Sequence, residues 1–187
     1  MHGSRDGSYA STVLRLDAPR AIVLTGVFGS GKSSMAGEIA DLVEGELPYA
    51  AIDLDWLAWF DAMDGSPEHE VGDVELKNVS DVVRNYLEAG VRLFVIAGAI
   101  RDAAELARLQ GVLPMPLTVV RLDVPVAEIE ARLGGDMTAG RQDDLRRTRE
   151  WIAAGQGTGF EDLVVVNDRP LRVVALEIIE RVSSAWA

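Results

Sequence analysis

The amino-acid sequence predicts an α/β fold, in which helices cover both faces of a parallel β-sheet. Three observations lead to this prediction: the chain has five short apolar runs, helical patterns separate them, and the connecting turns are short. Strands buried on both faces have such unbroken apolar runs, and parallel strands joined through helices form right-handed crossovers. We therefore expect a three-layer α/β/α domain.

The expected elements alternate along the chain. Apolar runs predict strands at residues 21–24, Tyr49–Asp53, 91–97, 117–122 and Leu163–Val166. Apolar residues spaced by three and four predict helices at residues 74–89, 101–109 and 126–133, and further helices after the first strand and after Pro170. Trp56, Trp59 and Phe60 also share one helical face, which favours a place in the core for this set.

Length and composition limit what the protein can be. A chain of 187 residues predicts one domain, here residues 17–187, after a polar, Gly/Ser-rich segment at residues 1–16 that we expect to be a flexible tail without a signal peptide. The net charge of −12 argues against nucleic acid or an anionic membrane as a partner. The absence of cysteine excludes disulfides and thiol nucleophiles and fits a cytoplasmic location. Apolar runs are too short to cross a bilayer.

The most informative segment is residues 26–33, Gly-Val-Phe-Gly-Ser-Gly-Lys-Ser, which matches the phosphate-binding pattern G-x-x-x-x-G-K-[ST] between a predicted strand and a predicted helix. Glycines permit positive φ angles, so that backbone N–H groups converge on phosphate oxygens at a helix N-terminus. Lys32 is expected to reach the β- and γ-phosphates, and Ser33 to ligate Mg²⁺. The residues expected to bind ATP in this segment are Gly26, Phe28, Gly29, Ser30, Gly31, Lys32, Ser33 and Ser34.

This segment resembles the Walker A motif of P-loop nucleoside triphosphatases, and residues 20–184 resemble their small-molecule kinase branch. That branch includes gluconate, shikimate, adenylyl-sulfate and nucleoside monophosphate kinases and chloramphenicol phosphotransferase. The resemblance implies a five-stranded parallel sheet in the order 2-3-1-4-5 and transfer of the ATP γ-phosphoryl group to a small acceptor. The two guanine-nucleotide strings of GTPases, Asp-x-x-Gly and Asn-Lys-x-Asp, do not occur in the chain.

Two aspartates follow the second predicted strand. Asp53 and Asp55 would lie at the carboxyl edge of the sheet, where ligands of open α/β sheets bind. By resemblance to the kinases, Asp53 is the first candidate for the base that accepts the acceptor's proton and for a metal ligand, and Asp55 is the second. Aspartate also caps helices well, so one of the two could instead begin the next helix. Trp56 follows at once and is a candidate for lining the acceptor site.

The resemblance suggests further site residues. Small residues after the strand at 91–97, such as Gly98, resemble those that leave space for the acceptor in shikimate and gluconate kinases, and Arg101 matches a basic residue of gluconate kinases. The Arg-rich stretch at 132–149 has the position of the kinase lid, which would span residues 134–149, and by this resemblance we expect Arg132 and Arg141 to neutralise charge on the transferring group. Asn167 has the position at which related kinases surround adenine, although a turn before a helix explains it equally well.

The sequence thus predicts an ATP- and Mg²⁺-dependent kinase, monomeric or homodimeric, that phosphorylates a hydroxyl of a small metabolite or antibiotic. A nucleotide acceptor is one alternative, because Arg84, Arg92 and Arg101 are near the relevant strands in sequence. An ATP-binding switch that acts through a partner protein is another. A third is a protein that binds phosphate without metal, since no acidic residue directly follows the strand at 91–97.

Overall fold

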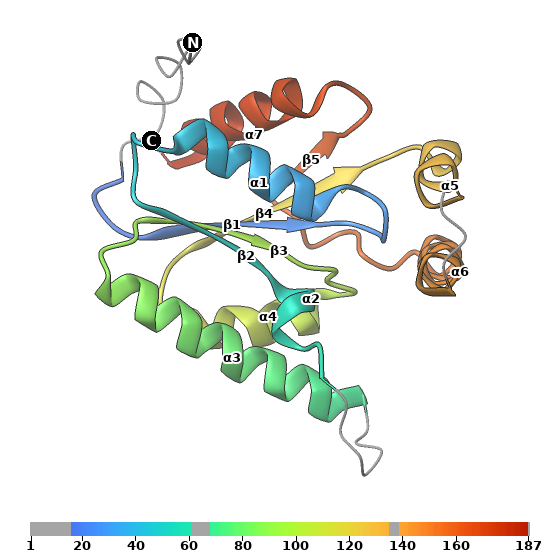
Figure 1. The fold of residues 1–187 in the computed structure, drawn as a ribbon, viewed down its shortest axis with the longest axis horizontal. Coiled ribbons are helices and arrows are strands. Elements are labelled where there is room, and N and C mark those ends of the chain that lie inside the picture. The colour runs from blue at the N-terminus through green and yellow to red at the C-terminus, as the bar shows by residue number, and fades with distance from the viewer. Residues whose placement is uncertain (1–15, 61–67, 135–138, 187) are drawn as a thin grey trace.

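The computed structural model describes residues 16–60, 68–134 and 139–186 (Figure 1). The predicted tail at 1–16 falls almost entirely outside the described residues. The strands are β1 (Arg20–Thr25), β2 (Tyr49–Asp53), β3 (Leu93–Ala97), β4 (Leu117–Asp123) and β5 (Leu163–Val166). The helices are α1 (Lys32–Val43), α2 (Leu54–Leu57), α3 (Glu68–Glu88), α4 (Ala103–Val112), α5 (Val126–Gly134), α6 (Ala139–Ala154) and α7 (Leu171–Trp186).

The five strands form one parallel sheet in the order β2-β3-β1-β4-β5. This confirms the predicted fold class and strand order. β1 lies in the centre, with Ile22 beside Val95 of β3 and Thr118 of β4. Because all strands run the same way, their carboxyl ends meet at one edge, where the segments after β1, β2 and β3 come together.

Helices cover both faces of the sheet. In Figure 1, α1 and α7 lie over one face, and α3 and α4 lie over the other. Side chains alternate along each strand, so Ile22 and Leu24 pack toward α1 and α7, while Ala21 and Val23 pack toward α3 and α4. The pair α5 and α6 lies beyond the carboxyl edge of the sheet, next to the turn that follows β1 (Figure 1).

The prediction that Trp56, Trp59 and Phe60 belong to the core is wrong. The side chains of Trp56 and Trp59 are 68% and 76% exposed, and Phe60 is also exposed. The prediction assumed one helix through all three residues, but α2 has only four residues, and Ala58 leaves the helical conformation at φ −118° and ψ 13°. The two indole rings instead contact each other, with centroids 4.8 Å apart.

Candidate active site

The turn between β1 and α1 is a glycine-rich loop, residues 26–31. Gly26, Gly29 and Gly31 have φ angles of 142°, 80° and 92°. A Cβ at Gly26 would come within 2.7 Å of the Leu122 carbonyl oxygen, so this position tolerates no side chain. Gly31 is the N-cap of α1 and supplies no side-chain cap, which leaves the first N–H groups of α1 accessible to another acceptor.

Lys32 places its amine inside this loop. Its Nζ donates hydrogen bonds to the carbonyl oxygens of Gly26 at 3.0 Å and Val27 at 3.1 Å, and the residue is only 8% exposed. Burial lowers the pKa of Lys32, and the charges of Asp55, Asp53 and Asp144 oppose that change. The buried ammonium group has lost its hydration. An anion with several negative charges, bound by this amine and by the nearby backbone N–H groups, would compensate for that loss.

One more polar atom in the loop needs a partner. The Ser30 hydroxyl is fully buried and has no hydrogen-bond partner within the described part of the chain. Buried hydroxyls usually have one. The glycine conformations, the uncapped helix N-terminus, the Lys32 amine and this hydroxyl together fit the phosphate groups of a nucleotide.

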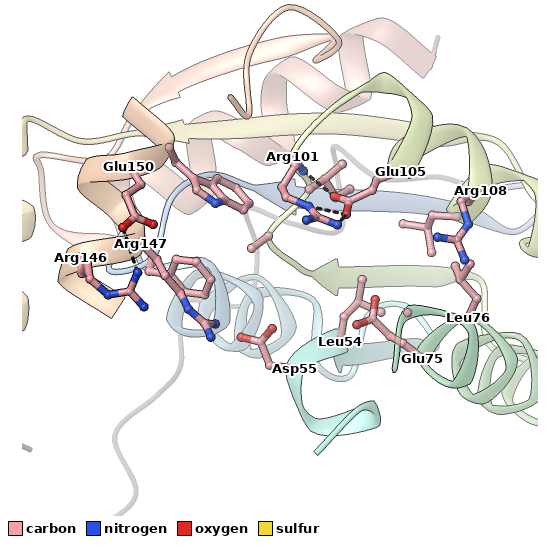
Figure 2. Close-up of a pocket in the computed structure, with 16 residues that line it drawn as sticks. Leu54, Asp55, Glu75, Leu76, Arg101, Glu105, Arg108, Arg146, Arg147 and Glu150 are labelled. Carbon is pink, nitrogen blue, oxygen red and sulfur yellow. Dashed lines mark hydrogen bonds and ion pairs between the residues drawn. The ribbon is translucent and has the colours of Figure 1, made fainter. Parts of the chain in front are cut away.

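A cleft of about 500 Å³ opens beside the loop (Figure 2). Phe28 of the loop lines one side of it, Asp55 and α3 line another, and α4 and α6 complete the wall. Its apolar lining comprises Phe28, Leu54, Leu76, Ala99, Ile100, Leu109 and Trp151. Its charged lining comprises Asp55, Glu75, Arg101, Glu105, Arg108, Arg146, Arg147 and Glu150. This mixture suits a small molecule with both polar groups and apolar surface.

The two aspartates after β2 have different surroundings. β2 ends at Asp53, whose carboxylate accepts a hydrogen bond from the Asp55 N–H at 3.0 Å and caps α2. The sequence left open which aspartate acts as a cap, and the structure assigns this contact to Asp53. The side chain of Asp55 lines the cleft, where burial raises its pKa, the Asp53 charge raises it further, and Lys32 opposes both.

Aromatic and basic side chains gather where the loop meets the cleft. The Lys32 Nζ lies 5.6 Å from the centroid of the Phe28 ring, and the Arg147 Cζ lies 5.9 Å from it. Trp151 packs its ring against Phe28 with centroids 5.6 Å apart. Arg147 also interacts electrostatically with Asp55. The loop, α6 and Asp55 therefore surround one small volume.

Known proteins resemble this chain in structure. A gluconokinase from Sinorhizobium meliloti 1021 superposes with a TM-score of 0.60 at 21% identity, over 90% of this chain and 95% of the other. The shikimate kinase of Acinetobacter baumannii gives 0.59 at 18% identity, over 90% and 95%. The APS kinase of Mycobacterium tuberculosis, solved with AMPPNP and APS, gives 0.59 at 23% identity, over 88% and 98%. No protein-family model and no curated protein matches the sequence.

The chain has the fold of the P-loop small-molecule kinases. The resemblance stated from the sequence is thereby confirmed at the level of fold. In this P-loop kinase fold, the glycine-rich loop occupies the turn after the central strand, and the cleft lies along the edge formed by β2 and β3. No described helix combines the length and apolarity that a membrane span requires.

Several residues expected from the sequence lie around the loop. Arg132, in the last turn of α5, pairs with Glu128 and donates to the carbonyl oxygen of Asn167 at 2.9 Å. Asn167 is 3% exposed, and its side-chain Nδ2 donates to the Ser30 carbonyl oxygen at 2.8 Å. Ser33 and Ser34 are exposed in the first turn of α1. Arg141 lies in α6, but its side chain is outside the described part of the structure.

The residues expected at the acceptor site divide into two groups. Arg101 lines the cleft and pairs with Glu105 (Figure 2). Gly98 lies behind the cleft, where a Cβ would come within 2.6 Å of the Leu54 side chain, so the glycine lets α2 approach β3. Trp56 is exposed and does not belong to the cleft lining.

Sequence reasoning missed the cleft residues on α3 and α4. These are Glu75 and Leu76 on α3, and Glu105, Arg108 and Leu109 on α4. No local signal marked them, because charged residues among apolar ones are equally typical of a solvent-exposed helix face. Burial raises the pKa of Glu75 to about 7, assisted by the charges of Asp55 and Glu105.

A cluster of carboxylates does not form a metal site in the described part of the chain. Within residues 16–60, 68–134 and 139–186, no three His, Asp or Glu side chains are grouped to hold a metal ion. Ser33 at the start of α1 and the aspartates after β2 nevertheless provide oxygen atoms near the loop, the ligand type that Mg²⁺ prefers.

Proposed function

We propose that this protein is an ATP-dependent kinase that phosphorylates a hydroxyl group of a small molecule. One observation carries the proposal: Phe28 belongs to the glycine-rich loop and also lines the cleft. A nucleotide whose phosphates occupy the loop would therefore present its terminal phosphate to a molecule in the cleft. Phosphoryl transfer needs chiefly this kind of positioning, together with charge neutralisation.

The basic groups at the junction would neutralise the transferring phosphate. Lys32 is buried in the loop, and the Arg147 guanidinium lies over the Phe28 ring. Figure 2 shows Arg147 on α6, at the wall of the cleft. Preorganised cations at the position where negative charge shifts are among the strongest contributors to catalysis. We assign Arg147 the role that the sequence suggested for Arg132 and Arg141, because Arg147 lines the cleft and interacts with Asp55.

Asp55 is our candidate for the general base. An acceptor oxygen in the cleft would form a bond to the γ-phosphorus as the bond from that phosphorus to the bridging oxygen of ADP breaks. The hydroxyl proton would pass to the Asp55 carboxylate. Partial desolvation and the neighbouring Asp53 raise the pKa of Asp55, which makes it a stronger base than an aspartate with an unshifted pKa.

Magnesium, when bound with ATP, would neutralise the β- and γ-phosphate charge. Ser33 is the side chain at the start of α1 that we expect to hold it, with Asp53 or Asp55 contributing through water. Asp53 would retain its capping contact to the Asp55 N–H in that role.

The cleft favours an acceptor alcohol without a phosphate group. The alternative of a nucleotide acceptor relied on Arg84, Arg92 and Arg101. Arg84 pairs with Asp81 outside the cleft, Arg92 precedes β3 at the far edge of the sheet, and Arg101 in the cleft already pairs with Glu105. The carboxylates of Glu75 and Asp55, when ionised, would also repel a phosphate group on the acceptor.

Mass spectrometry of products tests this proposal. The protein is incubated with Mg²⁺, ATP and pooled small alcohols that include sugars, sugar acids, amino alcohols, nucleosides and nucleoside monophosphates. We expect one class of alcohol to be phosphorylated, with one molecule of phosphorylated product for each molecule of ADP formed. Lys32→Ala should abolish the product, whereas Asp41→Asn, an exposed change on α1, should not. ADP formation without any phosphorylated acceptor would instead favour an ATPase that acts through a partner.

A further inference from the structure

Every carbonyl oxygen of the glycine-rich loop accepts a hydrogen bond. Lys32 Nζ donates to the Gly26 and Val27 oxygens, and the Met35 N–H donates to the Gly31 oxygen. The three carbonyls between them, at Phe28, Gly29 and Ser30, are bound by side chains from distant parts of the chain. Loop carbonyls more often face solvent, so this full set of partners calls for an explanation.

The three distant donors come from three different elements. Thr148 Oγ1 of α6 donates to the Phe28 oxygen at 3.0 Å. Asn167 Nδ2, in the turn between β5 and α7, donates to the Ser30 oxygen at 2.8 Å. Arg132 of α5 makes a longer contact to the Gly29 oxygen, at 3.4 Å.

Thr148 and Asn167 are unusually buried for polar residues, at 1% and 3% exposed. Burying a hydroxyl or an amide is unfavourable unless it is hydrogen-bonded, and both side chains direct their donors at the loop. The backbone of Asn167 is also fixed, because its N–H donates to the Asp123 oxygen and its carbonyl accepts from Arg132. Rigid supports of this kind restrict the conformations available to the loop.

Peptide geometry connects these carbonyls to the anion-binding side of the loop. In a planar trans peptide, the C=O of one residue and the N–H of the next point in opposite directions. Thr148 therefore directs the Gly29 N–H away from α6, and Asn167 directs the Gly31 N–H away from the β5–α7 turn. Neither N–H donates to another group within the described residues. Both remain available to an anion.

We propose that Thr148 and Asn167 are positioning residues that hold the glycine-rich loop in the conformation that binds nucleotide phosphates. The inference rests on the proposed function, since it requires that ATP binds at this loop. Thr148 lies on the same helix as Arg147 and Trp151, which contact Phe28. The Thr148 hydroxyl thus adds a backbone contact to the ring contacts by which α6 already holds the loop.

Isothermal titration calorimetry with ATP and with ADP tests the inference. Thr148→Val keeps the shape of the side chain and removes the donor, so the Phe28 carbonyl loses its partner. We expect the Kd for both nucleotides to rise about five- to tenfold. Thr148→Ser keeps the hydroxyl and should restore affinity to within about twofold. In steady-state assays, Thr148→Val should raise the KM for ATP and leave the KM for the acceptor unchanged.

Thr118→Val is the matched control. Thr118 is also buried, and its hydroxyl accepts a hydrogen bond from the Trp186 indole at 2.7 Å, but it lies at the start of β4, away from the loop. This variant should lower the Tm while the Kd for ATP stays as in the wild type. If Thr148→Val does not fold, Asn167→Ala replaces it, with the same rise in Kd expected.

The outcomes separate the two proposals. ATP binding by the wild-type protein, combined with an unchanged Kd in a folded Thr148→Val or Asn167→Ala protein, would overturn the positioning role alone. A rise in Kd that Thr148→Ser fails to reverse would also overturn it, because the effect would then follow from lost packing. No ATP binding by the wild-type protein would overturn the proposed function, and the inference with it.

Discussion

The Asp53 carboxylate accepts a hydrogen bond from the Asp55 N–H at 3.0 Å, and this contact separates the two aspartates by role. Asp53 fixes the start of α2, and the fixed start of α2 directs the Asp55 side chain into the cleft. Of two carboxylates two residues apart, one is therefore bound to backbone and the other faces the proposed acceptor. Their substitutions should have different consequences.

Asp55→Asn should lower kcat for phosphoryl transfer by about 10²–10⁴-fold, because the amide cannot accept the hydroxyl proton. The Kd for ATP should change little. Asp53→Asn is the comparison variant, since asparagine caps helices as well as aspartate does and its amide oxygen can still accept from a metal-bound water, so kcat should fall by less than about tenfold. Steady-state kinetics with calorimetric Kd values measure both. An equal loss of kcat in the two variants would contradict the assignment of Asp55 as the base and Asp53 as the cap.

Arg147→Ala should lower kcat by about 10–100-fold and leave the Tm nearly unchanged, because this arginine projects from α6 over Phe28 toward the proposed phosphate position. Arg149→Ala serves as control. Arg149 is two residues away on α6, pairs with Glu130 and does not line the cleft. If Arg147→Ala keeps the kcat of the wild type, the γ-phosphoryl group is transferred at some other position.

Glu75 should make stability depend on pH. Its pKa is raised by burial from 4.5 to about 7, so between these values the unfolded chain is ionised while the folded protein keeps the proton. Folding stability therefore falls as pH rises through this window. Glu75→Gln does not titrate and should raise the Tm at pH 8 by about 2–4 °C, after allowance for solvent screening. At pH 5 the gain should largely vanish.

The control for Glu75 is Glu88→Gln, an exposed change at the end of α3, which should leave the Tm the same at both pH values. Thermal unfolding followed by circular dichroism gives all six values. A gain for Glu75→Gln that is equally large at pH 5 and pH 8 would mean that side-chain packing, and not ionisation, causes it.

Gly31→Ala should weaken ATP binding about tenfold and destabilise the fold by about 1–2 kcal/mol. Gly31 has a φ of 92°, and an added Cβ would come within 2.9 Å of the Asn167 amide nitrogen. Gly37→Ala, in the middle of α1 with no atom within 4 Å of the added Cβ, should instead stabilise the protein by about 0.5–1 kcal/mol. Calorimetry and urea unfolding distinguish the two. Unchanged ATP affinity in Gly31→Ala would argue against the loop as the phosphate site.

The three inner strands β1, β3 and β4 were predictable because they are buried on both faces and so appear as apolar runs. The edge strands β2 and β5 are partly exposed, but their residues are apolar enough to give the same pattern. β2 and β5 have the predicted bounds, while β3 begins two residues later than expected, at Leu93. The glycine-rich loop was predictable for a similar reason, since its backbone geometry restricts the residue types. The order of the strands came from the resemblance to kinases, because apolar runs do not specify their neighbours.

The cleft was much less predictable. Its charged residues lie on α3, α4 and α6, where local sequence cannot distinguish a cleft-lining arginine or glutamate from a solvent-exposed one. The roles of Asp53 and Asp55 depended on which of the two caps α2, and aspartate is a good cap at either position. The support of the loop by Thr148 and Asn167 joins residues more than 100 positions apart, which no local pattern reveals.

A crystal structure with Mg²⁺ and a non-hydrolysable ATP analogue tests the central claim most directly. We expect the β-phosphate to accept hydrogen bonds from the N–H groups of the glycine-rich loop. The Lys32 amine should contact the γ-phosphate, which should face Asp55 and the cleft. An analogue bound away from this loop, or a γ-phosphate directed away from the cleft, would contradict the account.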